Sequence, residues 1–187
     1  MIIEPTSIPD VRIVTPKIFR DARGFFSETF NAQALAEAGI VGTFVQDNQS
    51  LSVQPGVIRG LHFQIAPRAQ DKLIRVTRGA ILDVAVDIRK GSPSYGRHVA
   101  VELSADNWRQ LWVPKGFAHG FCTLQPDTEV IYKVTDFYAP ECDRGIAWDD
   151  PALAIAWPVP AGGAILSDKD RKAPRLADIE PPFAYPA

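Results

Sequence analysis

Hydrophobic and polar residues alternate with a period of two along most of this chain, a pattern typical of half-buried β-strands. The runs that follow this pattern lie at residues 43–47, 56–64, 72–78, 80–88, 98–103, 110–113, 117–124 and 128–134. Gly79 separates two of them with almost no linker, which indicates a tight hairpin turn. Only residues 31–38 have the features of a helix, with Asn31 as the N-cap. Many short strands joined by turns predict an all-β fold with few short helices, and we expect a jelly-roll barrel or sandwich.

The composition indicates one domain with its own hydrophobic core. The chain has 187 residues, of which 46% are hydrophobic and 22% are charged, and its formal net charge is −2. A folded chain of this length buries roughly 70% of the surface that it exposes when unfolded. Six of its 16 prolines lie in residues 158–187, which we interpret as an irregular wrap over the β core. We therefore treat residues 1–187 as a single domain that includes the N-terminal segment and the proline-rich wrap.

Composition and charge also disfavour several classes of protein. A nucleic-acid partner calls for a basic domain, whereas this one is slightly acidic. No apolar run approaches the ~20 residues of a membrane-spanning helix, and the first ten residues lack the pattern of a signal peptide. The two cysteines, Cys122 and Cys142, have neither a metal-binding nor a redox spacing. We expect a reduced, cytoplasmic enzyme or binding protein with no nucleic-acid or membrane partner.

Two histidines stand in patterns that resemble the two motifs of the cupin fold. His62 follows Gly56 after five intervening residues, and His119 ends a Pro-x-Gly-x-x-His segment. Metal-binding cupins have a second histidine and a glutamate where this chain has Gln64 and, in an approximate alignment, Lys72. An amide and an ammonium group in these places would weaken and repel a cation. We therefore predict a cupin interior that holds no metal.

Positive charge is concentrated between Val57 and Ala80. This stretch holds five cations and one acid, a net charge of +4, which leaves −6 for the rest of the chain. The cluster either forms a solvated face or lines a pocket, where guanidinium groups would suit phosphate or carboxylate ligands. Strict alternation places Arg59 on the face opposite His62, so a pocket shared by both would need a bulge, for which Gly60 is the candidate.

Tyr132 is a third candidate for chemistry. A strand tyrosine is most often buried with its hydroxyl group satisfied, but beside a histidine and a lysine it becomes a candidate proton donor. These three residue types fit the removal of a proton alpha to a carbonyl group, followed by reprotonation. The chain has no Gly-rich dinucleotide fingerprint, and the reaction needs no cofactor.

Several segments, in the same order, resemble the dTDP-4-dehydrorhamnose 3,5-epimerase family. They include FRDARGFFSETF, FVQDNQSLS, GVIRGLHFQ, WVPKGFAHGF, YKVTDFYAP and LSDKD. The resemblance implies a metal-free cupin jelly roll, usually a homodimer, that acts as an isomerase in dTDP-L-rhamnose biosynthesis. It would convert dTDP-4-dehydro-6-deoxy-α-D-glucose to dTDP-4-dehydro-β-L-rhamnose by inverting C3 and C5 of the sugar.

The resemblance also implies roles for individual residues. His62 would be the general base, with Asp170 as its dyad partner, and Tyr132 would be the acid. Lys72 would neutralise the enolate. Besides Lys72, the substrate contacts that it implies are Arg23, Glu28, Gln46, Asp47, Asn48, Arg59, His119, Tyr138, Asp143 and Lys169.

Two of these residues need comment. Tyr138 would stack on the thymine ring. Asp143 stands where the family commonly has a glutamate, so its contact with the substrate stays open. Asp168 could be mistaken for the dyad acid, but Asp170 follows Lys169 in the family pattern and ranks first.

Three other functions compete with this interpretation. A related epimerase could act at C3 or C5 alone, and the candidate residues would be the same. A metal-dependent cupin, such as an oxygenase or a sugar-phosphate isomerase, is disfavoured by Gln64 and Lys72. A non-catalytic module that binds nucleotide sugars is disfavoured because Tyr132 and the candidate dyad are both present.

Overall fold

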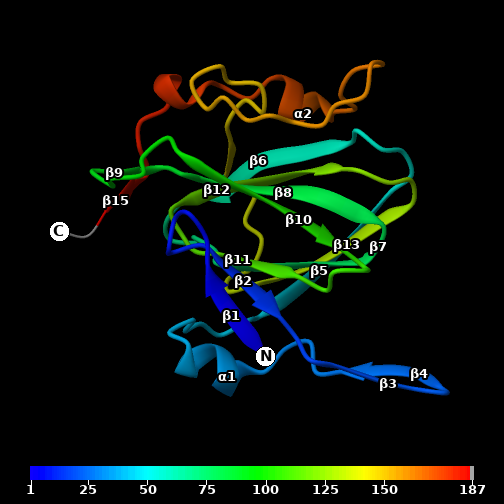
Figure 1. Ribbon diagram of the computed structural model, residues 1–187. Coiled ribbons are helices and arrows are strands. Elements are labelled where there is room, and N and C mark those ends of the chain that lie inside the picture. The colour runs from blue at the N-terminus through cyan, green and yellow to red at the C-terminus, as the bar shows by residue number, and fades with distance from the viewer. Residues whose placement is uncertain (186–187) are drawn as a thin grey trace.

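Two antiparallel sheets stack face to face in the computed structural model, which describes residues 1–185 (Figure 1). In spatial order the first sheet contains β1 (Ile2–Pro5), β2 (Arg12–Thr15), β11 (Gln110–Val113), β7 (Lys72–Arg78), β13 (Thr128–Val134) and β5 (Gln46–Ser52). The second sheet contains β10 (His98–Ser104), β8 (Ala80–Asp87), β12 (Phe117–Thr123), β6 (Ile58–Gln64) and β14 (Asp143–Gly145). The predicted all-β fold is confirmed.

Shorter elements lie outside these sheets. A hairpin of β3 (Ile18–Asp21) and β4 (Gly24–Ser27) extends from the body, and β9 (Arg89–Lys90) pairs in parallel with β15 (Phe183–Ala184) (Figure 1). The helical segments are α1 (Ala32–Glu37), α2 (Asp168–Arg171) and the 3-10 turn Leu176–Asp178. None of the helices within residues 1–185 has the length and hydropathy needed to cross a membrane.

The local signals in the sequence explain most element boundaries. The predicted helix is confirmed as α1, where the Asn31 side chain accepts a hydrogen bond from the Ala34 backbone at 3.1 Å. Gly79 has a φ of +74° between β7 and β8, and a Cβ there would lie 2.4 Å from Thr128 Oγ1. Only glycine therefore fits this predicted turn.

The prediction for β5 is wrong in its boundaries. Alternation placed this strand at residues 43–47, whereas it runs over Gln46–Ser52. One face of this edge strand meets solvent, where Leu51 is 52% exposed, and the other carries polar Asn48 and Ser50. Because neither face carries the hydrophobic residues that mark a half-buried strand, the sequence pattern misses it.

Hydrophobic residues fill the space between the sheets. Ile74, Leu111 and Val130 of the first sheet belong to one buried cluster with Ile81 and Phe121 of the second. Burial on this scale stabilises the sandwich by roughly 25 cal/mol for each Å² of apolar surface removed from water. Strands β7, β12 and β13 of this sandwich also carry residues of the functional site.

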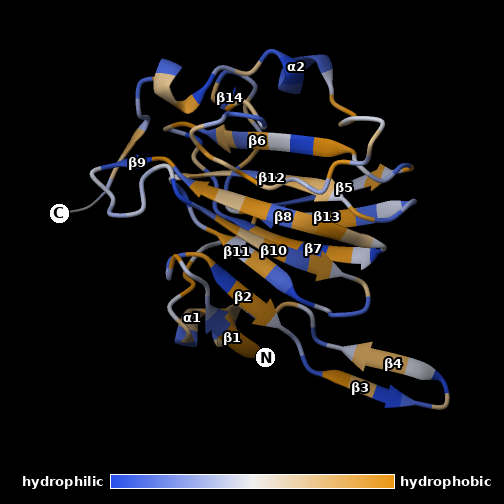
Figure 2. Ribbon diagram, turned by 45° about the horizontal axis from the view of Figure 1, so that its top comes forward, coloured by the Kyte–Doolittle hydropathy of each residue, from blue (hydrophilic) through white to orange (hydrophobic). Residues whose placement is uncertain are grey.

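Residues 146–157 and the C-terminal wrap that follows them cover the outer face of the second sheet. Ile146, Leu153 and Leu176 pack there against Leu61 and Val84. Strand β8 is therefore buried on both faces, and hydrophobic residues predominate along it in Figure 2. The wrap forms part of the core, and it places α2 over β6 (Figure 1).

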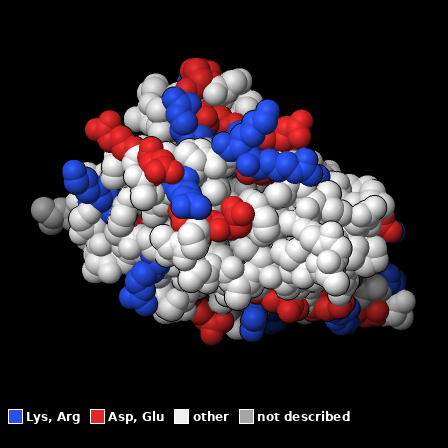
Figure 3. Space-filling model, turned by 90° about the horizontal axis from the view of Figure 1, so that it is seen from above, with Lys and Arg blue, Asp and Glu red and all other residues white. Residues whose placement is uncertain are grey.

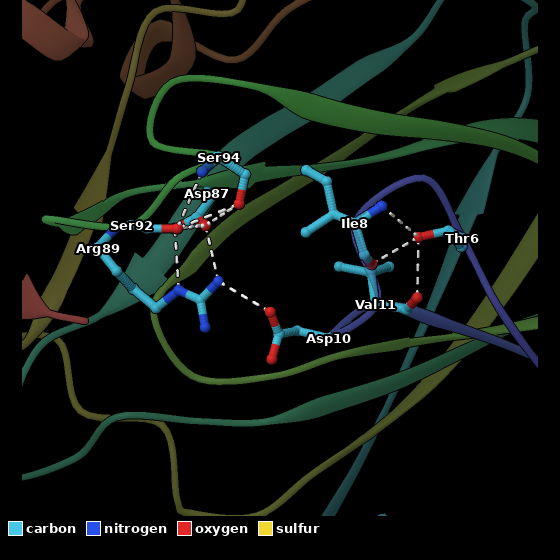
Figure 4. A network of polar contacts seen from close by, with 8 residues as sticks. All are labelled: Thr6, Ile8, Asp10, Val11, Asp87, Arg89, Ser92 and Ser94. Atoms are coloured by element: carbon cyan, nitrogen blue, oxygen red, sulfur yellow. Dashed lines mark hydrogen bonds and ion pairs between the residues drawn. The ribbon is translucent and has the colours of Figure 1, made fainter. Parts of the chain in front are cut away.

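Arg89 joins three distant parts of the chain, and Figure 4 shows its contacts with Asp87 and Asp10. Its Nε and Nη2 donate to Asp87 Oδ1 and Oδ2 at 2.9 and 2.7 Å, and Nη2 also donates to Asp10 at 3.1 Å. The guanidinium group lies over the rings of Phe117 and Tyr185, 4.5 and 4.8 Å from their centroids. These contacts connect the N-terminal turn and β9 to the end of the wrap.

Replacing Arg89 with lysine should lower the free energy of unfolding by about 2 kcal/mol, because an ammonium group loses the forked hydrogen bonds and the ring stacking. Urea denaturation followed by circular dichroism measures the difference. The exposed Arg97, changed to lysine, is the matched control and should shift the same quantity by less than about 0.5 kcal/mol. Equal stability of the two variants would contradict a stabilising role for the Arg89 contacts.

Candidate active site

A cavity of about 440 Å³ opens between the two sheets and brings together six of the predicted residues. They are Arg59, His62, Lys72, His119, Tyr132 and Asp170. Strands β6 and β12 of the second sheet supply Arg59 and both histidines, whereas β7 and β13 of the first sheet supply the lysine and the tyrosine. Groups suited to proton transfer therefore face the cavity from two sides.

His62 and Asp170 form a tight pair. His62 Nε2 lies 2.5 Å from Asp170 Oδ1, and the His62 side chain is 32% exposed whereas that of Asp170 is 4% exposed. Burial raises the pKa of Asp170, but hydrogen bonds from His62, Ser167 and the Gly60 backbone outweigh it and leave the pKa below its ordinary value. Because a carboxylate only accepts hydrogen bonds, the proton lies on Nε2 and Nδ1 carries the free lone pair.

A bulge in β6 brings Arg59 to the same cavity as His62. His119 pairs with His62 but Phe121 pairs with Arg59, so β6 has one extra residue in this interval. Gly60 lies within it at a φ of +130°, and a Cβ there would lie 2.5 Å from the backbone of Gly120. The bulge predicted from Gly60 is confirmed.

The Lys72 ammonium group is almost completely buried. The residue is 8% exposed, and its Nζ donates to the backbone oxygen of His62 at 3.2 Å. Burial lowers the pKa of Lys72 to about 8, although the negative charges of Asp143 and Asp83 oppose this shift. The group is therefore a cation at neutral pH and loses its proton in mildly alkaline solution.

Tyr132 is held as a neutral phenol. Burial raises its pKa above the ordinary value, and the nearby Arg59 offsets only part of that increase. The phenol therefore keeps a proton to donate at neutral pH. The neighbouring Lys133 points to the other face of the sheet and pairs with Asp47 at 3.0 Å, which confirms the alternation predicted for this strand.

A second cluster of polar residues surrounds Asp143, next to the cavity. Tyr138 donates its hydroxyl proton to Asp143 Oδ2 at 3.2 Å, and Lys169 pairs with the same oxygen. Gln46 accepts a hydrogen bond from the Tyr138 backbone at 3.0 Å and donates to Asn48 at 2.8 Å. The Tyr138 residue is 57% exposed, which leaves its ring free for stacking.

Asp143 and Lys169 also line an adjoining cavity of about 650 Å³ with His62 and Asp170. The surface that α2 and the wrap form carries basic and acidic side chains next to one another, as the view from above shows (Figure 3). Attraction of an anion to this face would therefore depend on individual cations rather than on a broad basic surface.

Three of the predicted residues lie apart from both the cavity of His62 and the polar residues around Asp143. Arg23 stands at the turn of the β3–β4 hairpin with its side chain 90% exposed, and it pairs with Asp21 at 2.6 Å. Glu28 and Asp47 line a separate cavity of about 250 Å³ together with Lys133. Their predicted contact with a substrate stays a prediction.

The cations of residues 57–80 were expected either to form a solvated face or to line a pocket, and the structure shows some of each. Arg59 and Lys72 line the cavity, whereas Arg68 pairs with Asp136 at 2.9 Å and Arg78 is exposed. Gln64, in the place of a cupin metal ligand, binds backbone groups: its amide donates to Arg68 and Phe137 carbonyls, and its oxygen accepts from the backbone of Ala139. Within residues 1–185 no three His, Cys, Asp or Glu side chains cluster in a way that could hold a metal ion.

Asp83 is a further polar residue next to the cavity, and it is not among the residues predicted from the sequence. This residue is 0% exposed and its Oδ1 lies 2.7 Å from His119 Nε2. A single acidic residue inside the hydrophobic run of residues 80–86 is the signal that could have found it. A charge in a strand that is buried on both faces requires a partner.

Residues 5–178 match the family model described as dTDP-4-dehydrorhamnose 3,5-epimerase. The dTDP-4-dehydrorhamnose 3,5-epimerase of Escherichia coli (strain K12) is 54% identical over 175 residues, which cover 93% of this chain and 94% of that protein. That of Sinorhizobium fredii (strain NBRC 101917 / NGR234) is 51% identical over 189 residues, 99% of this chain and 94% of that protein.

A solved structure of this family is similar to the chain in both fold and sequence. The crystal structure of the epimerase RmlC from Legionella pneumophila, in complex with dTDP-4-keto-L-rhamnose, has a TM-score of 0.94 and 48% sequence identity. It covers 99% of this chain and 98% of that one. The likeness therefore extends over the whole sandwich and over the strands that line the cavity.

Proposed function

This chain belongs to the dTDP-4-dehydrorhamnose 3,5-epimerase family, and on that premise we propose how its cavity carries out the reaction. The protein is a carbohydrate epimerase (EC 5.1.3.13) of dTDP-rhamnose biosynthesis. Its substrate is dTDP-4-dehydro-6-deoxy-α-D-glucose and its product is dTDP-4-dehydro-β-L-rhamnose. The observation that carries the assignment of roles is the His62–Asp170 pair facing Lys72 and Tyr132 across one cavity.

Proton abstraction is the work of His62. The protons at C3 and C5 are both alpha to the C4 ketone, so removal of either leaves an enolate stabilised by resonance. Nδ1 of His62 accepts the proton, and the carboxylate of Asp170 stabilises the imidazolium ion that forms. The buried ammonium group of Lys72 stabilises the enolate oxygen, a charge that develops only as the reaction proceeds.

Inversion requires a proton from the opposite face of the sugar. Tyr132 projects from the first sheet whereas His62 projects from the second, so acid and base approach a bound sugar from two sides. The neutral phenol of Tyr132 donates to the carbanion carbon, and the ketone is restored. After each inversion the phenolate regains a proton from solvent and the His62 imidazolium releases its proton to solvent, so that both groups are ready for the second carbon.

The nucleotide part of the substrate extends out of the cavity in this proposal, from a diphosphate held at its edge. Arg59 and Lys169 bind the diphosphate, because guanidinium and ammonium groups pair with phosphate oxygens. The exposed ring of Tyr138 stacks on thymine, with Gln46 and Asn48 beside it. The epimerase from Bacillus anthracis, a structure with TDP and PPi bound, supports this choice of ligand.

Conversion of dTDP-4-dehydro-6-deoxyglucose in deuterium oxide, followed by NMR, tests the function. We expect deuterium at both C3 and C5 of the product sugar. Deuterium at one carbon alone would favour the single-carbon epimerase instead, and no incorporation would leave a binding module. Activity should survive treatment with a chelator, because no step uses a metal.

The rate should fall as the pH rises through about 8. In the free enzyme, burial lowers the pKa of Lys72 to about 8, so the ammonium group that stabilises the enolate is lost above this pH. Lys72→Arg keeps a cation at every accessible pH and should remove the decline, at a lower overall rate. The measurement is kcat/KM from pH 6 to pH 10, and an identical alkaline decline in both proteins would contradict the assignment.

We also propose that the protein is a homodimer whose hairpins cross between protomers. Phe19, Phe25 and Phe26 of the β3–β4 hairpin are 50%, 59% and 70% exposed, which is unusual for a solvated hairpin. The hairpin extends from the body (Figure 1) and carries Arg23 at its turn. Docked on a second copy, the hairpin buries the three rings and brings Arg23 to the partner's substrate.

Mixing two inactive variants tests this exchange. Arg23→Ala and His62→Gln should each be nearly inactive as homodimers, but each hybrid dimer has one site with both natural residues. Co-expression of the two variants should restore about a quarter of the activity, since half of the dimers are hybrid. Absence of recovery in an isolated hybrid dimer would contradict a shared site.

We propose further that the whole chain acts as one domain in the cytoplasm. The support for a reducing compartment is that Cys122 and Cys142 are both buried and unpaired. Burial raises the pKa of the Cys122 thiol to about 11, which keeps it unreactive.

A further inference from the structure

Asp83 is the most unusual charged residue outside the proposed catalytic set. It is 0% exposed on β8, between Ile81 and Ala85, which face the hydrophobic core. Its neighbours in the adjacent strands are Val101 and Phe121. A carboxylate is costly in such surroundings unless it is paired, so a fold would not retain it for packing alone.

Only one of the two oxygens of this carboxylate has a hydrogen-bond partner. Oδ1 lies 2.7 Å from His119 Nε2, whereas Oδ2 is buried and has no hydrogen-bond partner among residues 1–185. The other charged group that faces Asp83 is Lys72, whose pKa its negative charge raises against the effect of burial. His119 is therefore the one ring that Asp83 holds in place.

The contact repeats the geometry of the His62–Asp170 pair. His119 and His62 are direct partners in the β12–β6 ladder, and both line the cavity. Each has its Nε2 against a buried carboxylate, Asp170 from the wrap in one case and Asp83 from the core in the other. By the same argument the His119 proton lies on Nε2, and Nδ1 is the atom that remains for a ligand.

We propose that Asp83 is a positioning residue for the reaction: it acts through His119, fixing its ring and its tautomer so that Nδ1 accepts a hydrogen bond from a hydroxyl group of the bound sugar. The inference rests on the proposed function, since the sugar is its ligand. Loss of the carboxylate would let the proton move to Nδ1, and the acceptor offered to the sugar would become a donor.

The variant Asp83→Leu removes the acceptor with little change of shape, and the apolar surroundings accommodate leucine. We expect kcat/KM to fall about 10- to 100-fold, the range for partners that orient a functional imidazole. Asp83→Asn retains one acceptor oxygen and should recover most of the activity. Removal of Asp83 also lowers the pKa of Lys72, so the comparison is made at pH 6, where Lys72 keeps its proton. In a His119→Gln background Asp83→Leu should then cause no further loss, because its effect passes through His119.

Nitrogen-15 NMR of the histidine rings reads the tautomer directly, with His119→Gln assigning the signals. In the unmodified protein we expect a protonated Nε2 and a bare Nδ1 at His119, and in Asp83→Leu a mixture of tautomers. A proton on Nδ1 in the unmodified protein would overturn the proposal even if no variant folds. An equal loss in both backgrounds would overturn it as well, whereas failure of the unmodified protein to convert the sugar would refute the proposed function.

Discussion

Replacing His62 with glutamine should reduce kcat by about 10³-fold or more, because the general base is lost. The glutamine amide can still donate to Asp170, so the buried carboxylate keeps a partner and the fold should persist. Solvent deuterium should no longer enter C3 or C5, since both exchanges begin with proton removal by the same imidazole. Product formation and deuterium uptake are followed together by NMR.

His98 provides the matched control for this variant. It begins β10, at the edge of the second sheet, on a strand that does not line the cavity. His98→Gln should therefore keep the full rate and the full uptake of deuterium. Undiminished exchange at both carbons in the His62 variant would exclude His62 as the base and would direct attention to His119.

The strands that the sequence predicts well are those with one hydrophobic face. Tyr132 and Lys133 point to opposite sides of the sheet, as alternation requires. The bulge at Gly60 could be predicted because Arg59 and His62 share a cavity only if one strand position is added between them. Strand β5 was misplaced because both of its faces are polar or exposed. A pattern based on burial detects only strands that bury something on one side.

The arrangement of the site was harder to predict, because it depends on contacts between residues far apart in the sequence. The pairing of Asp170 with His62 spans 108 positions and came from resemblance alone. Asp83 lies 36 positions from His119, and no local pattern joins them. Arg23 is a further case, because in the proposed homodimer its contact with the substrate depends on a second copy of the chain.

The charge of the chain illustrates the same limit. The sequence concentrates cations in residues 57–80, but position in the fold decides their use. Arg59 and Lys72 face the cavity, whereas Arg68 and Arg78 lie outside it. Because side chains alternate along β7, Lys72 and Arg75 point to opposite faces of the sheet. Arg75 therefore lines the separate cavity that also contains Glu28.

Replacing Tyr132 with phenylalanine should separate proton removal from inversion. Phenylalanine keeps the buried ring and loses only the proton donor, so we expect product formation to fall about 10²- to 10⁴-fold. His62 remains in place and can still remove and return protons on its own side of the sugar. Deuterium should therefore continue to enter the unreacted sugar, with its configuration retained.

This combination of results is specific for an acid opposite the base. Loss of a structural tyrosine would depress exchange and inversion together, whereas loss of the acid depresses inversion alone. Tyr95→Phe, in the loop before β10, is the control and should alter neither quantity. Full product formation by Tyr132→Phe would exclude the phenol as the donor. Because burial raises the pKa of Tyr132, the natural enzyme should invert its substrate with the phenol protonated throughout the neutral range, and the alkaline decline should follow Lys72 instead.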